Sequence, residues 1–108
     1  MLGPYIVRKR WFTPPVKGFT GIALYPFVFL RRGYSATIMR HELIHVWQVR
    51  KVGWLRFYLT YLLDACKYEY RAIPAEVEAY ANQHDPAYLP AELEKLVRAD
   101  PDARGSLT

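Results

Sequence analysis

Residues 39–49, MRHELIHVWQV, contain two histidines four positions apart, with a glutamate directly after the first. On an α-helix, positions i and i+4 lie on one face about 6 Å apart, so His41 and His45 can direct their ring nitrogens at one point. Imidazole nitrogen is a preferred ligand of Zn²⁺. Glu42 is rotated by about 100° from His41, which suits a general base better than a ligand. This is the HExxH arrangement of zinc-dependent hydrolases.

The residues around the histidines predict a buried central helix, because most of its sides are apolar. Ser35 or Thr37 can cap its start, and Gly53 predicts its end near Val52. Two histidines and a glutamate would be costly to bury in such a helix without partners, and a bound metal removes that cost. Gln48, which follows His45 by about one turn, is a candidate to orient a ligand or a later helix.

Catalytic zinc usually has three protein ligands and one water, so the motif needs a third ligand from farther along the chain. The longer metzincin motif is excluded, because Gln48 and Lys51 stand where it has glycine and histidine. The candidates are the later acidic residues and one histidine: Glu69, Glu76, Glu78, His84, Asp85, Glu92 and Glu94. A helix that returns to the histidines favours Glu76 or Glu78, of which only one can face the metal.

The remaining sequence predicts one domain, 1–108, that is strand-rich over 1–34, helical over 35–99 and ends in a polar tail, 100–108. YIVR (5–8) and GIALYPFVFL (21–30) are predicted strands, and Pro26 places the second at an edge or at a bulge. Further helices are predicted over about 54–70, 75–83 and 91–99, with Pro74 in the first turn of the third. Cys66 lies in an apolar helical stretch, where we expect a buried thiol.

Composition limits the function classes. The chain has 108 residues, a net charge of +5 and one cysteine, which fits a reducing, cytoplasmic location. Its basic residues are dispersed, so no specific nucleic-acid partner is expected. The longest apolar runs have about ten residues, half of what a transmembrane helix needs. Their aromatic residues and flanking arginines allow peripheral contact with a membrane.

The segments HELIHVWQ (41–48) and PAEVEAYA (74–81) resemble the gluzincin zinc metallopeptidases, in particular the single-domain minigluzincins and the core of the CAAX-protease-like branch. The resemblance implies a zincin-like α+β fold, with a small N-terminal antiparallel sheet packed on the HExxH helix and further C-terminal helices. It also implies Glu76 as the third ligand, followed by Ala79. Tyr80 departs from the family, which has at that position an aspartate that braces a ligand histidine. Glu78 with Asn82 is an alternative register.

The predicted function is a zinc metallopeptidase that hydrolyses peptide bonds in a peptide or protein substrate. In this hypothesis His41, His45 and Glu76 hold Zn²⁺, and Glu42 transfers protons as the general base. An extended substrate pairs with the strand from Ile22 to Leu30. The candidates for stabilising the oxyanion are Tyr34, Tyr70, Tyr80 and His84.

Two other classes stay open from the sequence. One is a non-catalytic zinc-binding or interaction module of zincin fold, which the presence of Glu42 disfavours, because a structural zinc needs no base. The other is a basic module that binds nucleic acid or a membrane surface. It depends on one patch formed by Arg31, Arg32, Arg50, Lys51 and Arg56.

Overall fold

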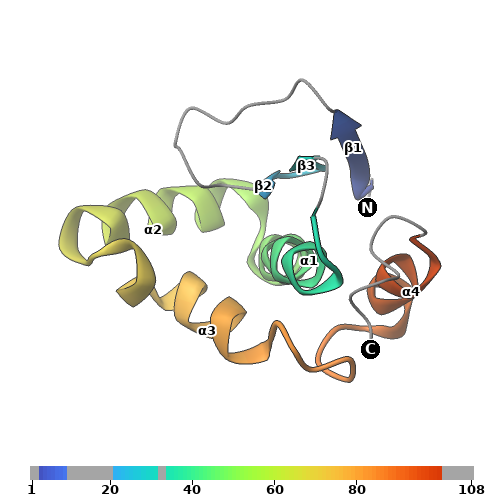
Figure 1. The fold of residues 1–108 in the computed structure, drawn as a ribbon. Helices are drawn as coiled ribbons and strands as arrows, with labels where there is room; N and C mark the ends of the chain where they lie inside the picture. The colour runs from blue at the N-terminus through green and yellow to red at the C-terminus, as the bar shows by residue number, and fades with distance from the viewer. Residues whose placement is uncertain (1–2, 10–20, 32–33, 101–108) are drawn as a thin grey trace.

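The computed structural model describes residues 3–9, 21–31 and 34–100. Within these ranges it is a small α+β fold of three strands, four α-helices and one 3₁₀ turn (Figure 1). Their order is β1 (Tyr5–Lys9), β2 (Gly21–Leu24), β3 (Phe27–Arg31), α1 (Ala36–Val52), α2 (Trp54–Lys67), η1 (Tyr70–Ala72), α3 (Pro74–Asn82) and α4 (Ala91–Ala99). The α+β class and the positions of the four helices agree with the sequence prediction.

The sheet is mixed, which corrects the predicted antiparallel arrangement. Its order is β1-β3-β2, and the central strand β3 pairs antiparallel with β2 but parallel with β1, where Tyr5 lies opposite Phe27. The stretch 21–30, predicted as a single strand, is a hairpin that turns at Tyr25 and Pro26. Proline cannot donate to a strand ladder and is readily accommodated in a turn, so Pro26 divides the segment rather than bulging it. β2 is therefore an edge strand and β3 is not.

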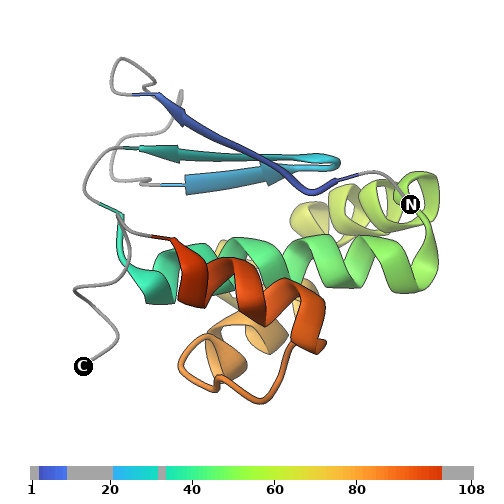
Figure 2. The same cartoon turned by 90° about the vertical axis from the view of Figure 1, so that its right-hand side faces the viewer.

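Helix α1 is the centre of the fold. Viewed along its axis, it is surrounded by the sheet, α2, α3 and α4 (Figure 1), and the sheet lies as a separate layer over it (Figure 2). The Ser35 side chain accepts a hydrogen bond from the Ile38 amide at 3.1 Å and caps the start of the helix, as predicted. The core comprises buried residues of β3, α1, α3 and α4, including Val28, Leu30, Met39, Leu43, Ile44, Ala79, Leu93 and Val97.

Gly53 ends α1 and joins it directly to α2. Its φ of 91° lies in a region that residues with a side chain rarely adopt, and glycine reaches it without steric penalty. The chain therefore changes direction in a single residue, and α2 runs across the axis of α1 and contacts it (Figures 1 and 2). This placement brings the inner side of α2 close to the histidines of α1.

Helix α2 differs most from its predicted environment. The apolar residues of the predicted helix, about 54–70, recur at helical spacing, yet no residue of α2 is buried. Cys66 is exposed, so the expected buried thiol is wrong. The reason is geometric: α2 contacts the rest of the fold through the side that carries Phe57, Tyr58 and Tyr61.

The last helix closes the opposite side of α1. The Arg40 guanidinium donates two hydrogen bonds to the Glu94 carboxylate, at 2.9 and 2.7 Å, and both side chains are buried. The Tyr34 hydroxyl donates to the Asp100 carboxylate, and Asp100 is only 2% exposed. The predicted polar tail thus starts with a buried residue, and the rest of that segment, 101–108, lies outside the described residues.

Candidate metal centre

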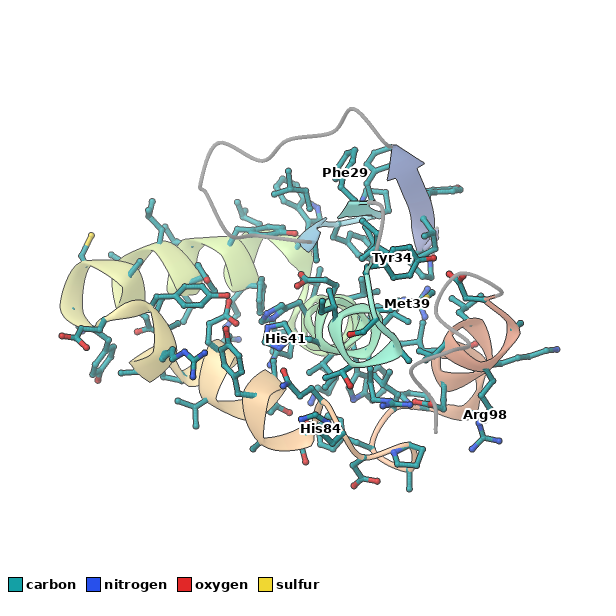
Figure 3. The ribbon with its side chains drawn as sticks, in the orientation of Figure 1. Phe29, Tyr34, Met39, His41, His84 and Arg98 are labelled. Atoms are coloured by element: carbon teal, nitrogen blue, oxygen red, sulfur yellow. The ribbon has the colours of Figure 1, made fainter. Side chains whose placement is uncertain are left out.

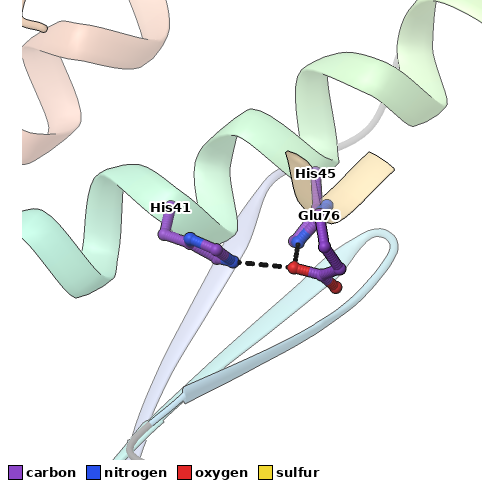
Figure 4. A group of neighbouring side chains, drawn as sticks. All are labelled: His41, His45 and Glu76. Atoms are coloured by element: carbon purple, nitrogen blue, oxygen red, sulfur yellow. Dashed lines mark hydrogen bonds and ion pairs between the residues drawn. The ribbon is translucent and has the colours of Figure 1, made fainter. Parts of the chain in front are cut away.

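Three side chains from two helices converge on one point between α1 and α3. His41 and His45, one turn apart on α1, each direct Nε2 at the same carboxylate oxygen of Glu76 on α3 (Figure 4). The distances to Glu76 Oε1 are 3.0 Å from His41 and 3.1 Å from His45. All three side chains are buried. Figure 3 shows His41 directed from α1 into the space bounded by α2 and α3.

The other nitrogen of each imidazole is held by a glutamine. His41 Nδ1 lies 2.7 Å from Gln83 Oε1, and His45 Nδ1 lies 2.8 Å from Gln48 Oε1. An amide oxygen is an acceptor, so each Nδ1 carries the hydrogen and donates it. In the neutral ring this leaves a lone pair on Nε2, directed at Glu76. Such bonds to the outer nitrogen are how proteins fix the tautomer of a metal-binding histidine.

The orientation of Gln48 is fixed independently. Its Nε2 donates to the Ala75 carbonyl at 3.0 Å and to the Glu78 carboxylate at 2.8 Å, so its Oε1 has to face His45. Gln48 thus orients both a histidine and helix α3, the two roles considered from the sequence. Glu78 is occupied by this bond and by Lys51, whose Nζ lies 3.6 Å away. Of the two glutamates on α3, the structure brings Glu76 and not Glu78 to the histidines.

Glu76 is held as a carboxylate. Burial favours its neutral form, but the close contacts with the imidazoles of His41 and His45 and with the Tyr61 hydroxyl outweigh burial and lower the pKa of Glu76 well below its ordinary value. The Tyr61 hydroxyl on α2 donates to the second oxygen, Oε2, at 2.7 Å. With Oε2 bonded to Tyr61, Oε1 alone faces the two imidazoles.

The geometry and the donor set fit a bound metal ion. Two ligand atoms at tetrahedral angles on Zn²⁺ are roughly 3.3 Å apart, and the His–Glu distances of 3.0 and 3.1 Å are close to that. The three ligand atoms all lie within 4.8 Å of one another. In neutral imidazoles with the hydrogen on Nδ1, the Nε2 lone pairs would face a carboxylate oxygen, so the contact requires either a metal ion or a second proton on the ring. The same requirement for positive charge raises the pKa of His45, where contact with Glu76 and the charge of Glu42 outweigh the opposing effect of burial.

Glu42 lies next to this centre but is not part of it. Its side chain is buried against β2, where the Ala23 amide donates a hydrogen bond to its carboxylate. Burial raises the pKa of Glu42, although the nearby histidines act in the opposite direction. A carboxyl group with a raised pKa, beside a metal site and not coordinated, is suited to accept and return a proton near neutral pH.

The other candidates from the sequence lie elsewhere or have other partners. Within the described residues, His41, His45 and Glu76 form the one group of His, Cys, Asp or Glu side chains close enough to share an ion. Glu94 is paired with Arg40, and Glu92 with Arg50. His84 lies on the connection after α3, with Nδ1 3.5 Å from the Thr37 hydroxyl (Figure 3).

The tyrosines proposed for the oxyanion divide into two sets. Tyr34 is buried against Asp100, on the side of α1 that faces α4, so it is not available to the metal centre. The Tyr80 ring packs edge-on against the His41 ring, with centroids 4.6 Å apart. Tyr70 packs against Tyr80, and burial together with the nearby charge of Glu76 raises its pKa. Tyr70 and Tyr80 therefore line the site.

Sequence reasoning missed Tyr61 and Gln83. Gln83 follows Glu76 by seven positions, or about two turns, so both lie on the same side of α3, and this spacing was a usable signal. Gln83 holds the His41 ring through its contact with Nδ1. Tyr61 comes from α2, whose orientation no local pattern specified.

A cavity of about 370 Å³ adjoins the centre between α1, α2 and α3. Gln48 and Tyr61, which bond His45 and Glu76, also form part of its wall. Phe57 and Pro74 supply apolar surface there. The metal centre is thus next to a space that can accommodate a side chain of a ligand.

The chain matches no protein-family model, no curated protein and no solved structure. What defines the class of this protein is therefore its own geometry: a small α+β fold with a buried His–His–Glu cluster of metal-binding type. No helix in the described part of the chain is long and apolar enough to cross a membrane.

Proposed function

We propose that this protein is a zinc-dependent peptidase of the gluzincin type. The observation that carries the proposal is the convergence of His41 Nε2, His45 Nε2 and Glu76 Oε1 on one point, with Glu42 buried beside them and not coordinated. A purely structural metal site has no need of this extra buried carboxylate. Its presence favours catalysis over a non-catalytic zinc module.

When bound, Zn²⁺ would supply Lewis-acid chemistry, polarising a substrate carbonyl and lowering the pKa of a water molecule. His41, His45 and Glu76 would hold it, each already oriented by Gln83, Gln48 or Tyr61. Glu42 takes the proton from the attacking water and gives it to the leaving amine. Its raised pKa brings it closer to neutrality, where both transfers are efficient.

The substrate would lie along β2. The Ala23 amide is directed at Glu42 rather than at β3, and in an extended strand the carbonyl of the same residue points to the same side. A peptide that adds to this edge is hydrogen-bonded by its main chain and passes directly by the general base. Within the predicted strand 21–30, β2 (Gly21–Leu24) rather than β3 can serve in this way, because β3 is paired on both sides. Tyr70 and Tyr80 are the remaining candidates to stabilise the oxyanion.

Zinc-dependent cleavage of peptides tests the proposal. Metal-free protein and protein loaded with one equivalent of Zn²⁺ are incubated with a library of unstructured peptides, and new termini are identified by mass spectrometry. We expect cleavage by the zinc-loaded protein, loss of cleavage on chelation and recovery when Zn²⁺ is added back. Cleavage that is the same with and without the metal, or zinc-loaded protein that cuts nothing in the library, would contradict the proposal.

A further inference from the structure

The outward side of α2 carries a continuous apolar stripe. Leu55, Leu59, Leu62 and Leu63 are 65%, 56%, 62% and 55% exposed, respectively. Their spacing of i, i+4, i+7 and i+8 places them on one side of the helix, and we call these four residues the leucine face. Trp54, at the start of α2, is 61% exposed. Single exposed leucines are common on protein surfaces, but four on one helical face indicate an interaction site.

The exposed charged residues of α2 are both positive. Arg56 precedes Leu63 by seven positions, and Lys67 follows it by four. Both residues therefore border the leucine face, and both are exposed. The one acidic residue of α2, Asp64, is half-buried and lines the cavity next to the candidate metal centre, and the exposed Arg56 also reaches the wall of this cavity. The exposed residues of α2 therefore combine the leucine face with two cations at its border and no anion.

The inner side of α2 is anchored to the fold. Tyr58 accepts a hydrogen bond from the Tyr25 amide at 2.7 Å, and Tyr61 donates to Glu76. These contacts fix the rotation of the helix about its axis. The leucine face is thus held outward, and turning it into the core would break the bond that orients a candidate metal ligand.

We propose that the leucine face docks on the surface of a bilayer that contains anionic lipids. An amphipathic helix with leucines and a tryptophan on one side and basic residues at its border lies in the bilayer interface, with its apolar side among the acyl chains and its cations at the headgroups. The charge pattern favours this over pairing with a second copy, because a two-fold contact between leucine faces would bring Arg56 and Lys67 close to the same residues of the other copy. The docked side faces away from the candidate metal centre, which Tyr61 contacts from the other side of α2.

Vesicle binding tests the proposal. The full chain is mixed with vesicles of phosphatidylcholine alone, or with about one third phosphatidylserine, and bound protein is measured by flotation. The Leu59→Gln/Leu63→Gln variant probes the leucine face, and Val77→Gln is its control, because Val77 on α3 is also 50% exposed. Arg56→Gln/Lys67→Gln probes the charges, with Lys95→Gln/Arg98→Gln on α4 as its control. All four change exposed side chains, and circular dichroism checks that the variants fold.

We expect the wild-type protein to bind the anionic vesicles at least tenfold more tightly than the neutral ones. The leucine variant should weaken binding by about tenfold or more, and the Arg56/Lys67 variant by roughly tenfold to thirtyfold, while both controls bind like the wild type. The proposal would be overturned if the wild-type protein did not bind anionic vesicles. It would also be overturned if the Leu59→Gln/Leu63→Gln variant and Val77→Gln bound these vesicles equally well. Lipid-free dimers that dissociate in the leucine variant would instead assign the face to a second copy.

Discussion

Replacing Glu42 with glutamine is expected to reduce peptide hydrolysis by about a thousandfold while leaving zinc binding unchanged. The amide has nearly the same volume and its oxygen can still accept the hydrogen bond from Ala23, so the fold and the ligands stay in place. It cannot, however, accept a proton from water or return it to an amine. The measurement is kcat/KM on a peptide found in the cleavage screen, together with zinc content by mass spectrometry.

The matched control is Glu92→Gln, which makes the same chemical change on a carboxylate of α4 whose side chain is 72% exposed. We expect this variant to keep wild-type activity, because an exposed ion pair contributes little. A Glu42→Gln protein that binds zinc and hydrolyses peptide at the wild-type rate would eliminate Glu42 as the base and would favour a non-catalytic metal module.

The second large effect is on stability. We expect Arg40→Met to destabilise the fold by roughly 3–5 kcal/mol, because it leaves the Glu94 carboxylate buried without its partner. In a chain of this size the melting temperature falls by about 12 °C or more. Arg40 also donates to the Gln83 carbonyl at 3.0 Å, and Gln83 braces His41, so the loss extends towards the metal centre. Thermal unfolding followed by circular dichroism measures the change.

Two further variants test whether the unpaired Glu94 carboxylate causes the loss of stability in Arg40→Met. Arg98→Met removes an exposed cation from the neighbouring helix and should change stability by less than about 0.5 kcal/mol. In Arg40→Met/Glu94→Leu both charges are absent, and we expect much of the lost stability to return. If the double variant were no more stable than Arg40→Met, the isolated carboxylate would not be the cause.

The helices were predictable because their signals are local. Ser35, Gly53 and Pro74 mark a cap, a stop and a first turn by their own backbone and side-chain chemistry. The sheet was not predictable in the same way. Whether β1 runs parallel to β3 depends on where the chain returns after β2, and no residue within a strand encodes that. Pro26 was predicted to place a single strand at an edge or at a bulge, whereas it lies in the turn that divides the segment into β2 and β3.

In the candidate site, too, some features follow from local sequence and others depend on tertiary packing. The spacing of His41 and His45 follows from helix geometry alone, and Glu76 followed from the gluzincin resemblance. The choice between Glu76 and Glu78 depends on how α3 is rotated on α1, which Gln48 fixes by bonding Ala75 and Glu78. The contribution of Tyr61 depends on the packing of α2. The same packing exposes the leucines of α2, because helical periodicity identifies an apolar side but not what covers it.

Metal stoichiometry in ligand variants tests the central hypothesis most directly. Wild-type protein, His45→Ala, Glu76→Ala and Glu78→Ala are each saturated with Zn²⁺, desalted and measured by native mass spectrometry. We expect one equivalent in the wild type and in Glu78→Ala, and a loss of affinity of more than about a hundredfold in His45→Ala and Glu76→Ala, which exceeds the effect of losing a group that only orients a ligand. A full equivalent of zinc retained by Glu76→Ala would contradict the His41, His45 and Glu76 site.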